Sequence, residues 1–275
     1  MTKTTIPIQE INYTSYIKGN LPIILSAPHG GDINAPEIKT RTSGIFDKDD
    51  FTKELTLDIV NEFHKQTNKY PYAVIMNLSR KKIDANRDIF EAIEMDDKNA
   101  LNAYNSFHKA INNSFDEVKS TFKYGLYFDI HGQSHSHNCL ELGYLLTNDK
   151  LKLEDKELKN YKEDSSLNSL SSISNKDFLD LLKGDSSFGT ILCKNAQDSI
   201  PSSKIHYAND DKEYFEGAFN TQSYSQIGSP MITAIQCEFP YKSRSTKENR
   251  LNCAKAFVYS IIEYYKIHFD IDLKA

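Results

Sequence analysis

Two histidines in this chain follow short apolar runs, where their imidazoles could bind a metal ion. His29 comes after the run 21–27, and His131 comes after the run 126–130. Two histidines and one carboxylate are the protein ligands of many catalytic zinc sites, which keep a further position for water. Asp129, two residues before His131, could orient the imidazole of that histidine from behind. The sequence therefore predicts a zinc site that still needs an acidic ligand.

Two acidic residues compete for the third ligand position. Asp32 comes three residues after His29, which is a common spacing for metal ligands. Asp50 stands where the next predicted helix begins and could turn back into the site. Its alternative role is a helix cap, for which Asp49 is also placed. The residues alone leave the choice between Asp32 and Asp50 open.

A polar and basic segment follows the apolar run 72–78 and contains Asn86 and Arg87. A guanidinium group forms a bidentate pair with a carboxylate, and the asparagine would add another donor. The segment could therefore bind a carboxylate of a substrate. The alternative interpretation is a surface ion-pair cluster, because further charged residues are adjacent.

Glu238 lies at the end of the apolar run 232–239. A carboxylate in that position is costly unless it has a partner. Beside a metal-activated water it would suit a general base that later protonates the leaving amine. We interpret three further histidines first as loop residues and second as residues that contact the zinc ligands without binding the ion. They are His135, His137 and His206.

The apolar runs and the helical patterns between them predict an α/β fold. Strands are expected at 21–27, 72–78, 126–130, 140–146 and 232–239, with a possible hairpin between the third and the fourth. Helices are expected from 51, over 97–119, and from Ser245 or Thr246 to about Lys266, with short helices in 177–196 and a polar loop over 200–230. We expect a mixed, mainly parallel sheet with helices on both faces. Ligands bind such sheets at the carboxyl ends of the strands, where His29, Arg80, His131 and Glu238 all lie.

The composition limits the classes of function. The chain has 275 residues and a formal net charge of −5, which argues against a nucleic-acid-binding protein. Its four cysteines show neither CxxC spacing nor the density of a disulfide framework. No signal peptide or membrane-spanning segment is recognisable, so we expect a cytoplasmic protein without a membrane partner. The prediction is a single domain over 1–275 with a polar insertion at about 147–176, and the oligomeric state is left open.

Several segments resemble the N-formylglutamate amidohydrolase family, which is related to the zinc carboxypeptidases. The similar segments are 26–31, 50–55, 79–87 and 141–144. Asp84, Asn86 and Arg87 also resemble the substrate clamp of zinc carboxypeptidases, and Asp129 with His131 resembles their strand-end ligand. The resemblance covers about 22–146 and resumes around 214–250. It implies an α/β fold of the zinc carboxypeptidase or phosphorylase/hydrolase-like type.

The resemblance also implies an activity and roles for individual residues. One Zn²⁺ ion would be bound by His29, His131 and an acid, with Asp50 slightly favoured over Asp32. The implied roles of the remaining residues are substrate carboxylate binding by Asn86 and Arg87, polarisation of the scissile carbonyl by Arg80, and activation of water by Glu238. The implied reaction is hydrolysis of an amide in a small N-acyl amino acid such as N-formylglutamate.

Two other functions remain open from the sequence. A zinc peptidase, either a carboxypeptidase or a γ-glutamyl hydrolase, would use the same catalytic residues in a cleft of different size. A catalytically silent binding protein of the same fold would lack the metal and the base. On either enzyme hypothesis the partner is a small molecule with a carboxylate.

Overall fold

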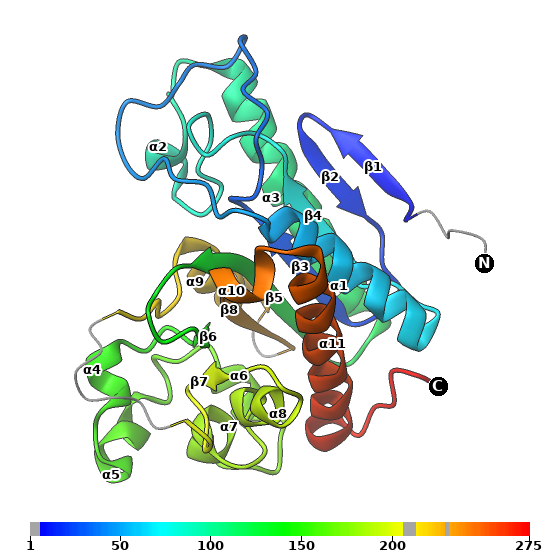
Figure 1. Ribbon diagram of the computed structural model, residues 1–275, viewed down its shortest axis with the longest axis vertical. Helices are drawn as coiled ribbons and strands as arrows, with labels where there is room; N and C mark the ends of the chain where they lie inside the picture. Colours follow the sequence, from blue (N-terminus) through cyan, green and yellow to red (C-terminus); the bar gives the residue numbers. More distant parts are fainter. Residues whose placement is uncertain (1–5, 206–212, 229–230) are drawn as a thin grey trace.

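The computed structural model describes residues 6–205, 213–228 and 231–275 and contains one eight-stranded mixed sheet (Figure 1). The spatial order of the strands is β1-β2-β4-β3-β5-β8-β6-β7. Their bounds are β1 Ile8–Ile11, β2 Thr14–Ile17, β3 Ile23–Ala27, β4 Tyr72–Met76, β5 Gly125–Gln133, β6 Leu140–Gly143, β7 Ser199–Ile200 and β8 Ile232–Pro240. The sequence predicted five of these strands and missed the short strands β1, β2 and β7.

The centre of the sheet is parallel. Strands β4, β3, β5 and β8 run in one direction, whereas β2 is antiparallel to β4 and β6 is antiparallel to β8. The possible hairpin between β5 and β6 does not form, because β8 lies between them. The connection 134–139 is long enough to cross over β8, because it has to span two strand spacings of roughly 5 Å each. The carboxyl ends of the parallel strands therefore share one edge with the start of β6.

One face of the sheet is covered by two long helices. These are α1 (Thr52–Thr67) and α11 (Lys247–Phe269), which contact each other and pack on the strands with α7 (Phe178–Lys183) and α8 (Phe188–Lys194). Helix α11 begins after Thr246, whose hydroxyl accepts a hydrogen bond from Asn249 N–H, as the sequence predicted. The apolar faces of these helices meet the buried strand residues in one continuous core.

The opposite face is covered by α3 (Lys98–Thr121) and α9 (Phe219–Gly228). Asp97 caps α3 by accepting hydrogen bonds from two backbone N–H groups of the first turn. The apolar stripe of α3, with Phe107, Ile111 and Phe115, packs on the sheet in a second core. Helices on both faces confirm the predicted α/β fold class (Figure 1).

The stretch 147–176, predicted as a polar insertion, is built of short helices. They are α4 (Asn148–Leu151), α5 (Asp155–Leu158), the 3₁₀ helix η1 (Lys159–Tyr161) and α6 (Asn168–Ser171). Leu151, Leu158, Leu167 and Leu170 from this stretch are buried in the same core as α1 and α11. The polar insertion is therefore attached to the core through its few leucines.

The remaining short helices are α2 (Ile89–Ala92) and α10 (Tyr241–Arg244). Within the described ranges, no helix combines the length and the apolar character that crossing a bilayer requires.

Candidate active site

The face of the sheet that α3 covers changes from apolar to polar toward the carboxyl ends of the strands. Along β5 the residues on this face are Tyr127, Asp129 and His131, and along β8 Ala234 leads toward Glu238. The opposite face of both strands stays apolar over the same length. Because alternate residues of a strand share one face, this change gathers ionisable side chains at one edge of a well-packed sheet.

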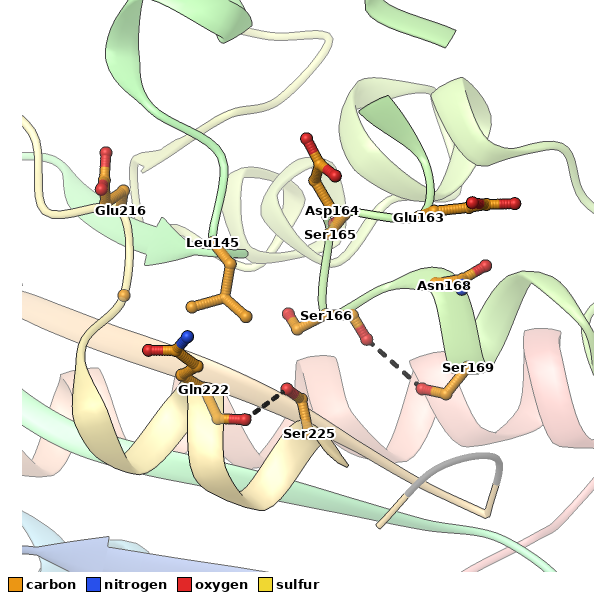
Figure 2. Close-up of a pocket in the computed structure, with 11 residues that line it drawn as sticks. Leu145, Glu163, Asp164, Ser165, Ser166, Asn168, Ser169, Glu216, Gln222 and Ser225 are labelled. Atoms are coloured by element: carbon orange, nitrogen blue, oxygen red, sulfur yellow. Dashed lines mark hydrogen bonds between the residues drawn. The ribbon is translucent and has the colours of Figure 1, made fainter. Parts of the chain in front are cut away.

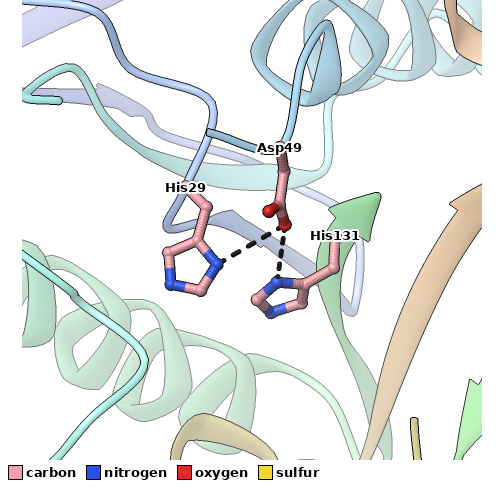
Figure 3. Close-up of side chains that lie close together, drawn as sticks. All are labelled: His29, Asp49 and His131. Carbon is pink, nitrogen blue, oxygen red and sulfur yellow. Dashed lines mark hydrogen bonds and ion pairs between the residues drawn. The ribbon is translucent and has the colours of Figure 1, made fainter. Parts of the chain in front are cut away.

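His29 and His131 meet at this edge although they are 102 positions apart in the chain (Figure 3). The centroids of their rings are 4.8 Å apart. Asp49 Oδ2 lies 3.4 Å from His29 Nδ1 and 3.1 Å from His131 Nδ1. The parallel pairing of β3 with β5 accounts for the approach, because both histidines come at the ends of neighbouring strands.

The acid between the two rings is Asp49, and this corrects the two candidates from the sequence. Asp50 is exposed to solvent, and the side chain of Asp32 is 75% exposed and lies 3.8 Å from Lys48. Helix α1 begins at Thr52 after Phe51, whose φ of 64° is left-handed, so neither aspartate forms a side-chain cap. The turn at Phe51 directs Asp50 toward solvent and leaves Asp49 facing His29 and His131.

Two backbone hydrogen bonds fix Asp49 in place. Its N–H donates to the carbonyl of His29 over 3.2 Å, and its Oδ2 accepts from Gly132 N–H over 3.2 Å. Gly31 lets the His29 loop pack on the end of β4, because a Cβ atom there would overlap the backbone of Asn77. Asp49 therefore links the loop after β3 to the end of β5.

Each histidine has a second, fully buried carboxylate on its other ring nitrogen. His29 Nε2 lies 2.7 Å from Asp84 Oδ1, and His131 Nε2 lies 2.8 Å from Asp129 Oδ2. Both carboxylates have no exposed side-chain area. Carboxylates in this position hold metal-binding histidines in one tautomer. On each ring the remaining nitrogen, Nδ1, faces Asp49.

The two supporting carboxylates are themselves fixed by hydrogen bonds. Asp84 accepts from Asn86 N–H over 3.1 Å and from Arg80 Nε over 2.9 Å. Asp129 accepts from the hydroxyl of Ser26 and, over 3.4 Å, from Asn220 Nδ2 of α9. The histidines are thus oriented by residues from both the sheet and its covering helix.

The electrostatics of the cluster favour a positive charge between its carboxylates. Burial acts to raise the pKa of Asp49, but His29 and His131 outweigh it and hold that pKa well below its usual range. Burial opposes the charge on His131, but Asp129 and Asp49 raise the pKa of this histidine well above its usual value. Two imidazole nitrogens and one carboxylate, all within 4.8 Å of one another, are also the ligand types that zinc prefers. The donor set fits one zinc ion.

Glu238 lies on the strand next to His131. The two residues are direct partners in the pairing of β5 with β8, so their side chains share a face. Glu238 is 5% exposed, and its Oε1 accepts a hydrogen bond from Gln236 Nε2 over 3.0 Å. Burial raises the pKa of Glu238 to about 8, against the opposing effect of His131. A carboxyl group with such a pKa can both accept and return a proton near neutral pH.

Arg80 and Asn86 lie at the site that the sequence proposed for them. Arg80 Nη1 lies 3.6 Å from Asp49 Oδ1, and its Nε is paired with Asp84. Asn86 is buried, with Nδ2 3.2 Å from His131 Nε2 and Oδ1 accepting from Asn220 N–H over 2.8 Å. The oxygen of this amide is therefore engaged by the protein, whereas Nδ2 cannot donate to a ring nitrogen that itself donates to Asp129.

Arg87 is half-buried, and its carbonyl accepts a hydrogen bond from the hydroxyl of Tyr104 over 2.9 Å. Among the described residues, its guanidinium group has no ion-pair or hydrogen-bond partner within the protein. Of the two residues in the predicted clamp, Arg87 is the one whose charged group has no partner among the described residues.

Arg244 is a structural residue of the site that the sequence did not reveal. Its guanidinium donates to the carbonyls of Phe239, Asp50 and Gln133 over 3.2, 2.8 and 3.0 Å. These carbonyls belong to the segments that carry Glu238, Asp49 and His131. A Cβ atom at Gly132 would overlap this guanidinium. No local pattern marks such a residue, because its three partners are far from it or from each other in the chain.

Replacement of Arg244 by methionine should lower the free energy of unfolding by about 2 kcal/mol or more, because three carbonyls, two of them buried, lose a charged donor. Urea unfolding of the metal-free protein measures this change. Lys242→Met, at an exposed position of the same helical turn, is the matched control. An effect no larger than that of the control would contradict the structural role.

His206 lies outside the described residues, and His135 and His137 contact the buried Glu141 rather than the first histidine cluster. A separate polar cleft of about 590 Å³ contains none of the predicted site residues (Figure 2). Its lining includes the carboxylates of Glu163, Asp164 and Glu216. This cleft would repel the carboxylate-bearing substrate predicted from the sequence, so it is not the candidate active site.

Comparison with solved structures identifies the fold. The chain is similar to N-formylglutamate amidohydrolase from Ralstonia eutropha JMP134, with 10% identity and a TM-score of 0.56 over 95% of this chain and 100% of the other. It is also similar to a gene product from Agrobacterium tumefaciens, with 11% identity and a TM-score of 0.51 over 90% and 93% of the two chains. No protein-family model and no curated protein matches the sequence. The fold that the sequence resemblance implied is therefore confirmed.

Proposed function

We propose that this protein is a zinc-dependent amide hydrolase that acts on small, carboxylate-bearing N-acyl amino acids such as N-formylglutamate. The observation that carries the proposal is the convergence of His29, His131 and Asp49 beside a buried Glu238 at one edge of the sheet. The likeness in fold to an N-formylglutamate amidohydrolase supports the choice of substrate class.

In this proposal the zinc ligands are His29 Nδ1, His131 Nδ1 and the carboxylate of Asp49. Asp84 and Asp129 would keep the opposite ring nitrogens protonated, so that both Nδ1 atoms present their lone pairs. A zinc ion held there supplies a Lewis acid that polarises a carbonyl and makes water more acidic.

Glu238 and Arg80 would act directly on the reacting groups. Glu238 would take a proton from the attacking water and return it to the leaving amine, which requires the carboxylate form at the start of the reaction. Arg80, which lies beside Asp49, would donate to the oxygen of the scissile carbonyl as negative charge develops on it. The metal site and this guanidinium would then stabilise the same oxyanion from two sides.

Arg87 would bind the carboxylate of the leaving amino acid, while Asn86 holds the segment in place. Arg87→Ala should raise KM by roughly 10- to 150-fold with a smaller change in kcat, because a charge-assisted contact contributes about 1.5–3 kcal/mol. Steady-state kinetics with N-formylglutamate measure both constants. Lys81→Ala, at an exposed position nearby, is the control. A fall in kcat with unchanged KM would exclude this role for Arg87.

The proposed function is tested by zinc analysis and by a panel of substrates. The purified protein should contain one zinc ion per chain and should release formate from N-formylglutamate. Short α-linked and γ-linked peptides in the same assay separate an amidohydrolase from a carboxypeptidase or a γ-glutamyl hydrolase. Preferred cleavage of a peptide would reject the substrate class, and a metal-free protein without activity on any amide would reject the enzyme.

A further inference from the structure

A buried glutamine lies directly beside the carboxylate that serves as the base in the proposed function. Gln236 precedes Glu238 by two positions on β8, so both side chains lie on the same face of the sheet. Gln236 is 3% exposed, and its Nε2 donates a hydrogen bond to Glu238 Oε1 over 3.0 Å. One strand therefore carries both the carboxylate and the group that hydrogen-bonds it.

Two buried carboxylates neighbour Gln236, and among the described residues its amide donates to only one of them. Asp129 is its direct partner in the pairing of β5 with β8. The oxygens of Asp129 are already engaged by His131 and by two further donors. On the other side the partner of Gln236 is Gly143 of β6, which has no side chain. The side-chain donor of Gln236 is therefore left for Glu238.

The two carboxylate oxygens of Glu238 have different surroundings. Oε1 accepts the hydrogen bond from Gln236. Oε2 accepts from no group of the described residues and, unlike Gln236 Oε1, is not closed off from solvent. A carboxylate that is held at one oxygen keeps its orientation, which gives the other oxygen a fixed direction. The oxygen that is left for a water molecule is therefore Oε2.

The stability of the fold does not account for a glutamine at this position. Within the described ranges, Gln236 Oε1 is buried and has no hydrogen-bond partner. An unpaired buried acceptor destabilises the folded state, and an apolar residue of similar size would avoid that cost. The adjacent residues of β8, Ile235 and Cys237, are themselves buried and apolar. The hydrogen bond from the amide nitrogen then accounts for the glutamine.

We propose that Gln236 is a positioning residue that holds Oε1 of Glu238, so that Oε2 exchanges the proton with the attacking water. This inference rests on the proposed function, because it takes Glu238 as the general base. The amide donor also stabilises the charged form of the carboxyl group. That form is the one that can accept a proton from water.

Replacement of Gln236 by methionine, which has a similar size and no donor, should lower kcat by roughly 10- to 150-fold and leave KM nearly unchanged. That range corresponds to the loss of one hydrogen bond to a charged group. Steady-state kinetics with N-formylglutamate measure both constants, and the zinc content should not change. Thr233→Val is the matched control, because it removes a buried hydrogen bond to Ser169 from the other end of β8. The control should leave kcat nearly unchanged.

A double-mutant cycle separates this role from a structural one. Gln236→Met should have almost no effect on kcat in the Glu238→Gln background, because the base on which the amide acts is missing. A structural defect would lower kcat by the same factor in both backgrounds, and that result would overturn the proposal. Gln236→Leu removes the same amide with a different shape and should repeat the whole pattern. A pattern that only one of the two variants shows would also overturn the proposal.

Crystal structures of the unaltered and the Gln236→Met proteins test the inference without turnover. The carboxylate of Glu238 should have one orientation in the unaltered protein, with Oε1 beside Gln236, and a different orientation or several in the variant. One unchanged orientation in both proteins would overturn the proposal. An unaltered protein that hydrolyses no amide would reject the proposed function. A reoriented carboxylate in the variant would still support the positioning of Glu238 by Gln236.

Discussion

Replacing Glu238 by glutamine is expected to lower kcat by about 10²–10⁴-fold while the zinc content stays at one ion per chain. That range is the usual contribution of a general acid–base group. Glutamine keeps the size of the side chain and can still accept the hydrogen bond from Gln236, but it cannot take a proton from water. Because Glu238 is not among the proposed zinc ligands, the loss should fall on turnover and leave the metal bound.

The readouts for Glu238→Gln are kcat with N-formylglutamate and zinc per chain in the same preparation. Glu216→Gln, at an exposed glutamate that lines the separate polar cleft, is the matched control for loss of one negative charge. Loss of zinc together with turnover would show that Glu238 supports the metal. Full activity in the variant would remove it from the mechanism.

The apolar runs of the sequence predicted the central strands and most of the site, because a buried strand must be apolar except where it ends. His29, His131 and Glu238 break such runs, and the parallel pairing brings strand ends to one edge. The structure gathers these side chains there, next to Asp84 and Asp129. This part could be predicted because it depends on periodicity and on the known geometry of parallel sheets.

The identity of the third acid could not be predicted for a local reason. Asp49 and Asp50 are adjacent, and which one faces inward depends on the backbone of Phe51, with its φ of 64°. Phenylalanine is not a residue that signals a left-handed conformation, so the pattern favoured an ordinary helix cap. A one-residue rotation of the turn exchanges the inward and outward side chains.

Long-range contacts account for the other differences. The sequence could not place β8 between β5 and β6, because pairing depends on segments about 100 residues apart. That insertion brings Glu141 opposite Glu238 and turns His135 and His137 from loop residues into neighbours of the site. Arg244 was missed for the same reason, since its role exists only after the carbonyls of Asp50, Gln133 and Phe239 have been brought together.

Asp49→Asn should weaken zinc binding by more than about 100-fold and abolish the activity that depends on it. Loss of a supporting carboxylate behind a ligand already costs about 10- to 100-fold in metal affinity, and here the carboxylate is itself a proposed ligand. Asparagine has nearly the same shape, and its oxygen can still accept from Gly132 N–H, so the fold should persist. Circular dichroism checks the fold, and zinc retained after dialysis against a competing chelator measures the affinity.

Asp50→Asn and Asp32→Asn are the matched controls for Asp49→Asn, because each removes the same charge near the same loop. Both side chains are exposed and lie outside the cluster of His29, His131 and Asp49, so zinc affinity should stay within about twofold of the unaltered protein. Loss of zinc in Asp50→Asn with retention in Asp49→Asn would reverse the assignment. The comparison depends only on which of three similar acids contacts the two imidazoles, so it tests the metal site separately from the choice of substrate.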